Sequence, residues 1–273
     1  MNVLTLCADD IGQDPLIDTA CLELFQMGRL SCVSALSEAP HASNMFSEWQ
    51  DARQQGLQVG LHFNLTVPFA KNPIARPINT WIALSQCRLI QRNLKRLIKE
   101  CLNRQLDLFE QQFGFSPDYV DGHQHVHQFP GIRDVLFDVL SSRYSSFLPW
   151  LRSTSPISYQ IATLVKYPAI FKTLSLSFLG GIAFRKELIQ LGFTTNQGFL
   201  GVYNFDSDSM ENYREKMLQW LSLCQDGALI MCHPASGLVL DDAIGPQRVL
   251  EFNYLNSIKF EQDLLRFKLD IKH

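Results

Sequence analysis

The sequence predicts an α/β fold in which parallel β-strands are joined by crossover helices. Short apolar runs alternate with longer segments of helical spacing along most of the chain. Polar residues follow directly on several of these runs, as they do where buried parallel strands end. A chain of 273 residues can bury a sizeable core, and α/β barrels of this length commonly form one domain. We therefore expect residues 1–273 to be a single domain.

The first third of the chain shows this rhythm most clearly. Val3–Ala8 is an apolar run, expected to be a buried strand, that stops at Asp9 and Asp10. Asp14-Pro15 supplies a helix N-cap followed by a first-turn proline, and Gly28 closes that helix. The next expected elements are a strand at Ser31–Leu36, a helix at Pro40–Gln55 and a strand at Leu57–Leu65.

The rest of the chain continues the pattern with interruptions. Val67–Thr80 contains three prolines and is expected to be a loop. Residues 153–200 show no clear pattern, and we interpret them as an insertion or substrate-cap region. The remaining expected elements are helices at Ser85–Phe113, Pro130–Ser142, Ser209–Cys224 and Gln247–Phe267, and strands at Pro117–Asp121 and Ala228–Cys232.

Three of the seven histidines are clustered after the strand expected to end at Asp121. His123, His125 and His127 occupy alternate positions, and in an extended segment such residues point to one face. Clustered imidazoles are costly in an apolar core because each ring carries polar nitrogens, whereas neutral imidazole is the commonest metal ligand. We therefore expect a metal or catalytic site here, rather than core histidines bonded to the backbone.

Four expected strand ends carry titratable residues, and ligands bind outside the carboxyl ends of parallel strands. One carboxylate and two imidazoles can hold a divalent ion while leaving positions open for water and substrate. A second carboxylate could take a proton from that water, and a histidine opposite could protonate a leaving amine. The residues alone do not say which aspartate would hold the metal. The groups expected to share this site are Asp9 and Asp10, His62, the cluster from Asp121 to His127, and His233.

Four short motifs occur in order over residues 8 to 234. They are Ala8-Asp9-Asp10-Ile11-Gly12, Gly60-Leu61-His62-Phe63-Asn64-Leu65-Thr66, Asp121-Gly122-His123-Gln124-His125-Val126-His127 and Cys232-His233-Pro234. Together they make the sequence resemble the YdjC-like carbohydrate deacetylases, which include chitooligosaccharide and hopanoid-biosynthesis deacetylases. The resemblance implies a distorted, incomplete (β/α) barrel of the NodB-like deacetylase type. It also implies metal-dependent removal of acetyl groups from N-acetylated sugars.

By matching position, the resemblance assigns roles within the site. It implies that Asp9 is the catalytic base and that His233 is the general acid, which also steadies the oxyanion. The implied ligands of one divalent metal ion are Asp10, His62 and His123, with His125 as the alternative to His123. Zinc is the expected ion, with magnesium or another divalent ion as the alternative. The residues expected to face substrate or to support the ligands are Asn64, Asp121, His125, His127 and Arg152.

Composition and charge are those of a cytoplasmic globular enzyme. The net charge of −3 gives no indication of a nucleic-acid partner. The seven cysteines are scattered and odd in number, which favours reduced thiols over a disulfide framework. The N-terminus does not have a signal-peptide pattern, and no stretch of 18 apolar residues predicts a membrane-spanning helix. The oligomeric state stays open, with a homodimer as one option.

The substrate prediction depends on Val139–Lys186, a stretch with no acidic residue and six basic residues among large apolar ones. Such a pattern suits a surface lying on an anionic membrane. We therefore expect the substrate to be an N-acetylhexosamine on a lipid carrier or glycolipid, with peripheral contact at the inner face of the membrane. The alternative for this segment is an ordinary insertion that packs on the barrel and carries solvated charges. Soluble chito-oligosaccharides are the alternative substrates, and a catalytically inactive sugar-binding protein is the alternative of another class.

Overall fold

The computed structural model describes residues 1–69, 72–156 and 177–272. All the strand pairings in these residues are parallel, and the strands follow the spatial order β5-β4-β3-β2-β1-β7-β6, with β8 beside the start of β1. The strands are β1 (Asn2–Ile11), β2 (Cys32–Ala35), β3 (Gln58–Phe63), β4 (Tyr119–Gly122), β5 (Trp150–Leu151), β6 (Gly198–Leu200), β7 (Ala228–Cys232) and β8 (Leu269–Ile271).

Strand β1 is the centre of this sheet. It pairs with β7 through Leu4–Ala8, and its other edge pairs first with β8 and then with β2. Leu4, Leu6 and Ala8 are fully buried in the main hydrophobic core. The strand is covered on both faces, so an uninterrupted apolar sequence is what this position requires.

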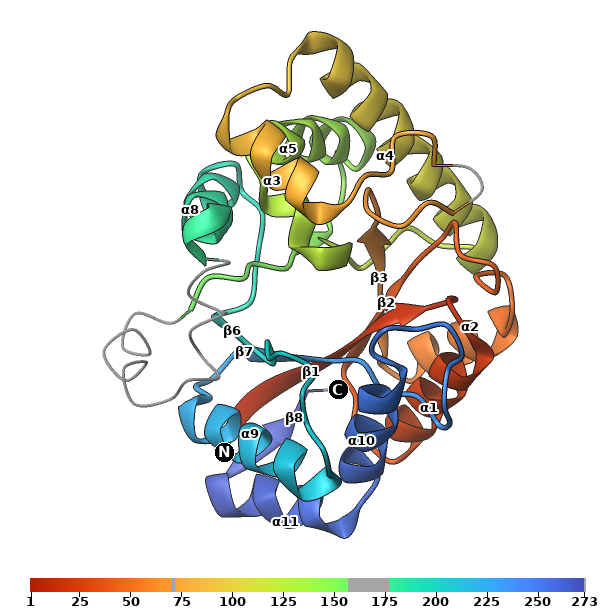
Figure 1. Ribbon diagram of the computed structural model, residues 1–273, viewed down its shortest axis with the longest axis vertical. Helices are drawn as coiled ribbons and strands as arrows, with labels where there is room; N and C mark the ends of the chain where they lie inside the picture. The colour runs from red at the N-terminus through yellow and green to blue at the C-terminus, as the bar shows by residue number, and fades with distance from the viewer. Residues whose placement is uncertain (70–71, 157–176, 273) are drawn as a thin grey trace.

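Helices surround the sheet, as Figure 1 shows. Helix α1 illustrates how the sequence sets their ends: Asp14 Oδ1 accepts the Leu16 N–H at 2.8 Å, and Pro15 occupies the first turn. The helices of the described residues are α1 (Pro15–Gln26), α2 (Phe46–Gln54), α3 (Ile78–Gln86), α4 (Arg92–Phe113), α5 (Ile132–Arg143), α8 (Ile182–Gln190), α9 (Met210–Leu223), α10 (Gly245–Leu255) and α11 (Ile258–Phe267).

The sheet curves into a half-barrel, and a few hydrogen bonds outside the strand pairings connect its two ends. Asn196, just before β6, accepts the Ser153 N–H at 2.8 Å and donates to the Ser153 carbonyl at 3.0 Å. The Leu151 N–H of β5 also donates to the Thr194 carbonyl at 3.0 Å. The expected α/β fold with an incomplete barrel is therefore confirmed.

Most expected elements are present, with shifted ends. Ser85–Phe113 is wrong as one helix: α3 ends at Gln86 and α4 begins at Arg92, with Arg88 in the left-handed region at φ 54°. The helix expected over Gln247–Phe267 is also two helices, divided at Asn256 and Ser257. In both cases the apolar spacing continues through the break, so periodicity does not reveal it.

The segment interpreted as an insertion, residues 153–200, lies partly outside the described residues, since 157–176 are not among them. Its described remainder contains α8 and the short strand β6, which completes one end of the sheet. Among the described residues, no helix combines the length and apolar character needed to cross a membrane.

Candidate active site

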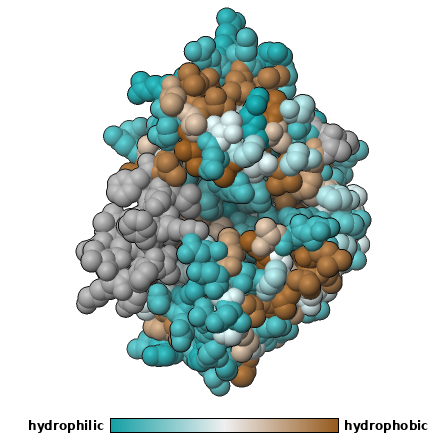
Figure 2. Space-filling model, viewed as in Figure 1, coloured by the Kyte–Doolittle hydropathy of each residue, from teal (hydrophilic) through white to brown (hydrophobic). Residues whose placement is uncertain are grey.

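The residues predicted to form one site meet at the carboxyl ends of β1, β3, β4 and β7. Six of them line a cleft of about 740 Å³, namely Asp9, Asp10, His62, His123, His125 and His233. Asp121 and His127 are fully buried behind these residues and do not line it. Helix α3 and the segment before it form one side of the cleft, and the segment leading into α10 forms the other. Figure 2 shows the cleft as a hollow between these two sides. The arrangement follows from the parallel sheet, because the carboxyl ends of its strands lie along one edge.

Asp9 and Asp10 both turn into the cleft although they are adjacent in the chain. Neighbouring residues of a regular strand point to opposite faces. Asp10 departs from strand geometry, with φ at 74°, a conformation that aspartate tolerates better than most residues. This local turn at the end of β1 places both carboxylates beside His62, whose Nε2 lies 3.9 Å from Asp9 Oδ2 and 3.5 Å from Asp10 Oδ1.

Asp10, His62 and His123 offer a set of ligand atoms that all lie within 4.8 Å of one another. His123 Nδ1 is 3.1 Å from Asp10 Oδ1, and His62 Nε2 is 3.5 Å from the same oxygen. Ligands at about 2.0–2.2 Å from a tetrahedral zinc ion are separated from one another by about 3.3–3.5 Å. The donor set and its spacing therefore fit a zinc-sized ion, with three protein ligands and room for further ones.

His62 is held from behind by Asp121. The His62 Nδ1–H donates to Asp121 Oδ1 at 2.6 Å, which leaves Nε2 as the atom that faces Asp10. Burial alone would lower the pKa of His62, but the carboxylates of Asp121, Asp9 and Asp10 outweigh burial and raise it to about 9. A carboxylate behind an imidazole in this way is the usual support of a histidine that binds metal.

Arg152 joins Asp9 to Asp121 beneath the cleft. Its Nη1 and Nη2 donate to the two Asp9 oxygens at 2.6 and 2.8 Å, and Nη1 also lies 2.9 Å from Asp121 Oδ2. Burial would raise the pKa of Asp9, but Arg152, with His62 and His233, outweighs it and holds that pKa well below its ordinary value. Cys7, Asp9 and Asp121 form a second close group of potential ligands, and the guanidinium already lies against its two carboxylates.

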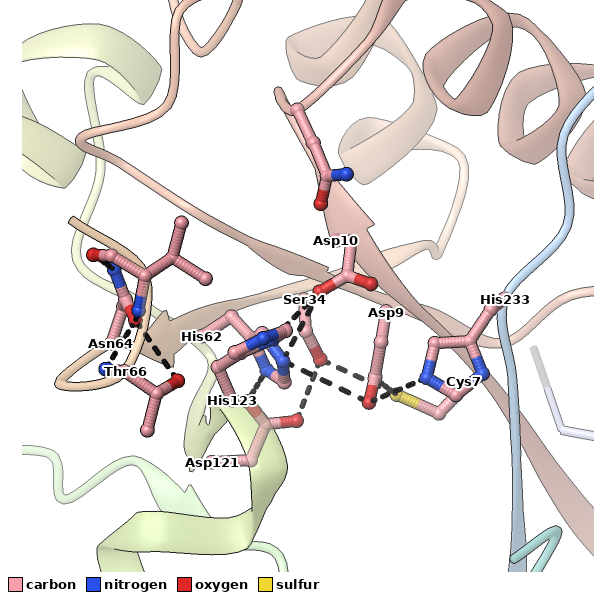
Figure 3. Close-up of polar contacts among 12 residues, drawn as sticks. Cys7, Asp9, Asp10, Ser34, His62, Asn64, Thr66, Asp121, His123 and His233 are labelled. Carbon is pink, nitrogen blue, oxygen red and sulfur yellow. Dashed lines mark hydrogen bonds and ion pairs between the residues drawn. The ribbon is translucent and has the colours of Figure 1, made fainter. Parts of the chain in front are cut away.

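His233 follows β7 and lies on the other side of Asp9 from His62 and His123 (Figure 3). Its Nε2 is 4.0 Å from Asp9 Oδ2, and its Nδ1 has no hydrogen-bond partner among the described residues. Burial lowers the pKa of His233 to about 4, against the attraction of Asp10 and Asp9. The ring is therefore neutral near pH 7, and it lines the cleft beside Asp9.

The three clustered histidines do not share one face of a strand, which corrects the expectation for this segment. Strand β4 ends at Gly122, and a tight turn follows in which Gln124 and His125 have left-handed φ values of 51° and 59°. His123 reaches Asp10, whereas His127 Nε2 lies 2.8 Å from the Arg152 carbonyl and is fully buried. His125 lines the cleft, with its ring edge-on to Phe199.

Asn64 supports the cleft from the end of β3. Its Oδ1 accepts the N–H groups of Thr66 and Val67 at 2.9 Å, and its Nδ2 donates to the Val67 carbonyl. These bonds shape the turn that carries Val67 to the wall of the cleft. Asn64 is therefore positioned as a support of the wall, and it does not itself line the cleft.

The family model for the YdjC-like protein family matches residues 3–266. The chain belongs to this family. A carbohydrate deacetylase of Mus musculus is 30% identical over 149 residues, which are 51% of this chain and 47% of the mouse protein. A chitooligosaccharide deacetylase of Proteus mirabilis is 30% identical over 139 residues, 48% of this chain and 52% of that protein. The chain thus spans about half the length of the curated relatives it matches.

Among solved structures, one described as a "putative cellobiose-phosphate cleavage protein" of Enterococcus faecalis is similar to this chain. It has a TM-score of 0.68 and 18% sequence identity, and the match covers 100% of this chain and 98% of the other. At this identity the similarity shows a shared fold and nothing about function. The incomplete barrel of this YdjC-like chain is consistent with that shared fold.

The site contains residues that sequence reasoning missed. Arg248 and Glu251 of α10 are buried beneath Asp10 and His233, and Ser34 of β2 donates to Asp121 Oδ2 at 2.6 Å. In the sequence, both α10 residues look like ordinary charges on an amphipathic helix. The signal that could have found them is their spacing of three, which places them on one helical face together with apolar neighbours.

Proposed function

We propose that this chain is a metal-dependent hydrolase that removes the acetyl group from an N-acetylated amino sugar. The observation that carries this proposal is that the two adjacent aspartates, Asp9 and Asp10, have different partners. Asp10 lies with His62 and His123 as a set of metal ligands, whereas Asp9 is held next to this set by Arg152. A metal site with a second, non-ligand carboxylate beside it suits the hydrolysis of an amide, because that carboxylate can accept a proton from the attacking water.

Asp10, His62 and His123 would hold one divalent ion. When bound, such an ion would act as a Lewis acid toward the amide carbonyl and would make water a stronger acid. Two imidazoles and one carboxylate favour zinc over magnesium, because magnesium prefers an octahedron of oxygen ligands. Asp121 fixes His62 through the 2.6 Å bond to Nδ1, so the ligand nitrogen is already oriented toward Asp10.

Asp9 would take the proton of the attacking water as its oxygen bonds to the acetyl carbon. The carbon–nitrogen bond then breaks, and the amine leaves with the proton that Asp9 accepted. In this proposal the general-acid role expected of His233 therefore passes to Asp9, because a neutral imidazole is a poor proton donor. His233, neutral and with Nε2 4.0 Å from Asp9, would donate a hydrogen bond to the oxyanion that develops on the acetyl group. The products are acetate and the free amino sugar, with one water consumed.

The walls of the cleft favour an N-acetylhexosamine that carries an apolar aglycone, such as a lipid carrier. Phe69, Ile78 and Ile82 line one side, and Phe205 and Ile244 line another part of the cleft. The polar side chains left for sugar hydroxyls are few, and they include Gln13, Asn79 and Gln124. A soluble chito-oligosaccharide offers this wall only its N-acetyl methyl groups and the C–H faces of its rings, and it remains the second candidate because relatives carry that name.

The prediction of a membrane contact from Val139–Lys186 has to be corrected in part, because three of its six basic residues have protein partners. Arg152 is fully buried on Asp9, Arg143 pairs with Asp107 and Glu110, and Arg185 donates to the Asn196 carbonyl and Gln197. These three cations bind protein rather than a lipid surface. Lys166 and Lys172 lie outside the described residues. The support for a lipid-linked substrate therefore comes from the apolar residues that line the cleft.

Mass spectrometry tests the proposal with zinc-loaded protein and two substrates, chitobiose and a lipid-phosphate-linked N-acetylhexosamine. We expect a mass change that corresponds to replacement of acetyl by hydrogen, with faster turnover of the lipid-linked sugar. Turnover of chitobiose alone would support the soluble substrate. Binding of either sugar without acetate release would overturn the proposed hydrolase activity and favour a sugar-binding protein. Flotation with anionic and neutral vesicles, measured in parallel, separates membrane contact from lipid recognition in the cleft.

A further inference from the structure

Two buried charged residues of α10 lie one helical turn apart on the side that faces the cleft. Arg248 is 2% exposed and Glu251 is 0% exposed. Charged side chains are almost never buried to this extent unless they are paired. Arg248 and Glu251 have different partners, and each set of partners belongs to a different half of the candidate active site.

Arg248 contacts the metal-ligand half. Its Nη2 donates to Asp10 Oδ2 at 2.7 Å, and its Nε donates to Asp242 Oδ2 at 2.6 Å. Asp242 is itself fixed by the Ile244 N–H, which it accepts at 3.0 Å. Because Arg248 occupies Oδ2, the other oxygen of Asp10 is left facing His62 and His123. The bond also restrains a residue whose backbone has the uncommon φ of 74°.

Glu251 contacts the half that contains His233. Its Oε2 accepts the His233 backbone N–H at 2.6 Å, and its Oε1 accepts the Tyr203 hydroxyl at 2.6 Å. Tyr203 and His233 both line the cleft. The Ala235 N–H also donates to the Arg248 carbonyl at 3.2 Å, so the chain after β7 is attached to α10 at two points.

We infer that Arg248 and Glu251 are positioning residues. Through them, helix α10 independently orients the metal-ligand half of the site and the half that contains His233. Arg248 orients Asp10 for metal, and Glu251 orients His233 and Tyr203 for the substrate. This inference rests on the proposed function, since it assumes that Asp10 is a ligand and that His233 acts on the substrate. It predicts a separation of effects: Arg248 controls metal affinity, and Glu251 controls turnover.

The test measures Zn²⁺ affinity by competition with a chelator, and kcat and KM at saturating Zn²⁺. Arg248→Met should weaken Zn²⁺ binding by about 10–100-fold, the usual effect of losing a support of a metal ligand. Arg248→Lys should recover part of this affinity, because Lys keeps one charged donor. Glu251→Ala should leave Zn²⁺ affinity unchanged and lower kcat by about 10–100-fold. Glu251→Gln should recover most of kcat, because the amide can still accept the His233 N–H and donate to Tyr203.

Arg214→Met is the matched control for a general loosening of α10. Arg214 of α9 binds Asp263 through Nε at 2.7 Å, and Asp263 also accepts the Tyr254 hydroxyl of α10 at 2.9 Å. This variant should lower the unfolding temperature with Zn²⁺ affinity and kcat unchanged. If Arg214→Met loses as much Zn²⁺ affinity and kcat as the α10 variants, or if Arg248→Met binds Zn²⁺ like the wild type, this inference is overturned. Either result would leave the proposed function standing. A wild-type chain that binds no Zn²⁺ would overturn the proposed function and this inference with it.

Discussion

The guanidinium of Arg152 contacts both carboxylate oxygens of Asp9, at 2.6 and 2.8 Å, in a fully buried pair. Two parallel bonds of this kind fix the carboxylate plane as well as its charge. Asp9 is thereby kept ionised and oriented. The neighbouring Asp10 has one oxygen directed to two imidazoles instead. The proposed chemistry depends on this difference between two adjacent residues.

The first prediction concerns the three proposed metal ligands. His62→Ala and His123→Ala should each lose bound zinc and acetate release together, because each removes one of three ligand atoms. His125→Ala and His127→Ala should keep zinc, since neither ring belongs to this group of atoms. Elemental analysis of the four purified variants checks this. Full zinc in His123→Ala together with loss in His125→Ala would assign the ligand to His125.

The second prediction concerns His233. His233→Ala should keep zinc and lose about two to four orders of magnitude in kcat, the usual contribution of a positioned acid, base or oxyanion donor. The pKa of about 4 for this ring also predicts that kcat does not fall as pH rises from 6 to 7.5, since the ring is neutral throughout. A rate that follows an ionised imidazole over this range would show that His233 works as a cation.

The third prediction concerns Asp18, whose Oδ1 accepts the Gly12 N–H at 2.7 Å beneath the turn after Asp10. Burial raises the pKa of Asp18 to about 7, against the bond from Gly12. Between pH 3.8, the ordinary pKa of an aspartate, and about pH 7, the folded chain therefore holds a proton that the unfolded chain has lost. This group's contribution to stability is lost as pH rises through that window and is constant above it.

Asp18→Asn removes this titration and keeps an oxygen for Gly12. The unfolding temperature of the variant should exceed that of the wild type at pH 8, by at least about 2–4 °C, the shift that about 1 kcal/mol produces in a domain of this size. The difference should shrink toward pH 4. Thermal unfolding at a series of pH values measures it, and a difference that does not depend on pH would contradict the assignment.

The fourth prediction concerns the apolar wall. Ile82→Gln should lower kcat/KM for a lipid-linked N-acetylhexosamine and leave kcat/KM for chitobiose nearly unchanged, because Ile82 belongs to the apolar wall and is not one of the proposed catalytic or ligand residues. One apolar side chain contributes a factor of about 10–200 in such discrimination. Leu89→Gln is the control, since Leu89 is 54% exposed and does not line the cleft. Equal losses for both substrates would remove the argument for an apolar aglycone.

The strand ends were predictable because each of them depends on local sequence. The apolar run before Asp9 and the run before His233 each stop at a polar residue, and parallel strands necessarily bring such ends together. The turn at His123–Gln128 was not predictable, because two successive left-handed φ values, at Gln124 and His125, are uncommon and no local turn signal marks them in the sequence. The alternation of histidines therefore suggested a common face that does not exist.

The buried cations were the least predictable part of the site. Arg152 was expected both near the site and among the charges of a basic surface, but its pairing with Asp9 and Asp121 was not predicted. These partners lie 143 and 31 positions earlier in the chain. Arg248 is likewise 238 positions from Asp10. Sequence spacing carries no information about pairs this distant, and only the folding of the chain into the curved sheet brings them into contact.

The most direct test of the central claim is to measure the zinc content and acetate release of Asp9→Asn and Asp10→Asn side by side. The proposed roles predict that Asp9→Asn retains one zinc per chain and loses about two to four orders of magnitude in rate. Asp10→Asn should lose zinc and activity together. An Asp9→Asn protein without zinc, or an Asp10→Asn protein with full zinc, would contradict the division of roles between these two aspartates.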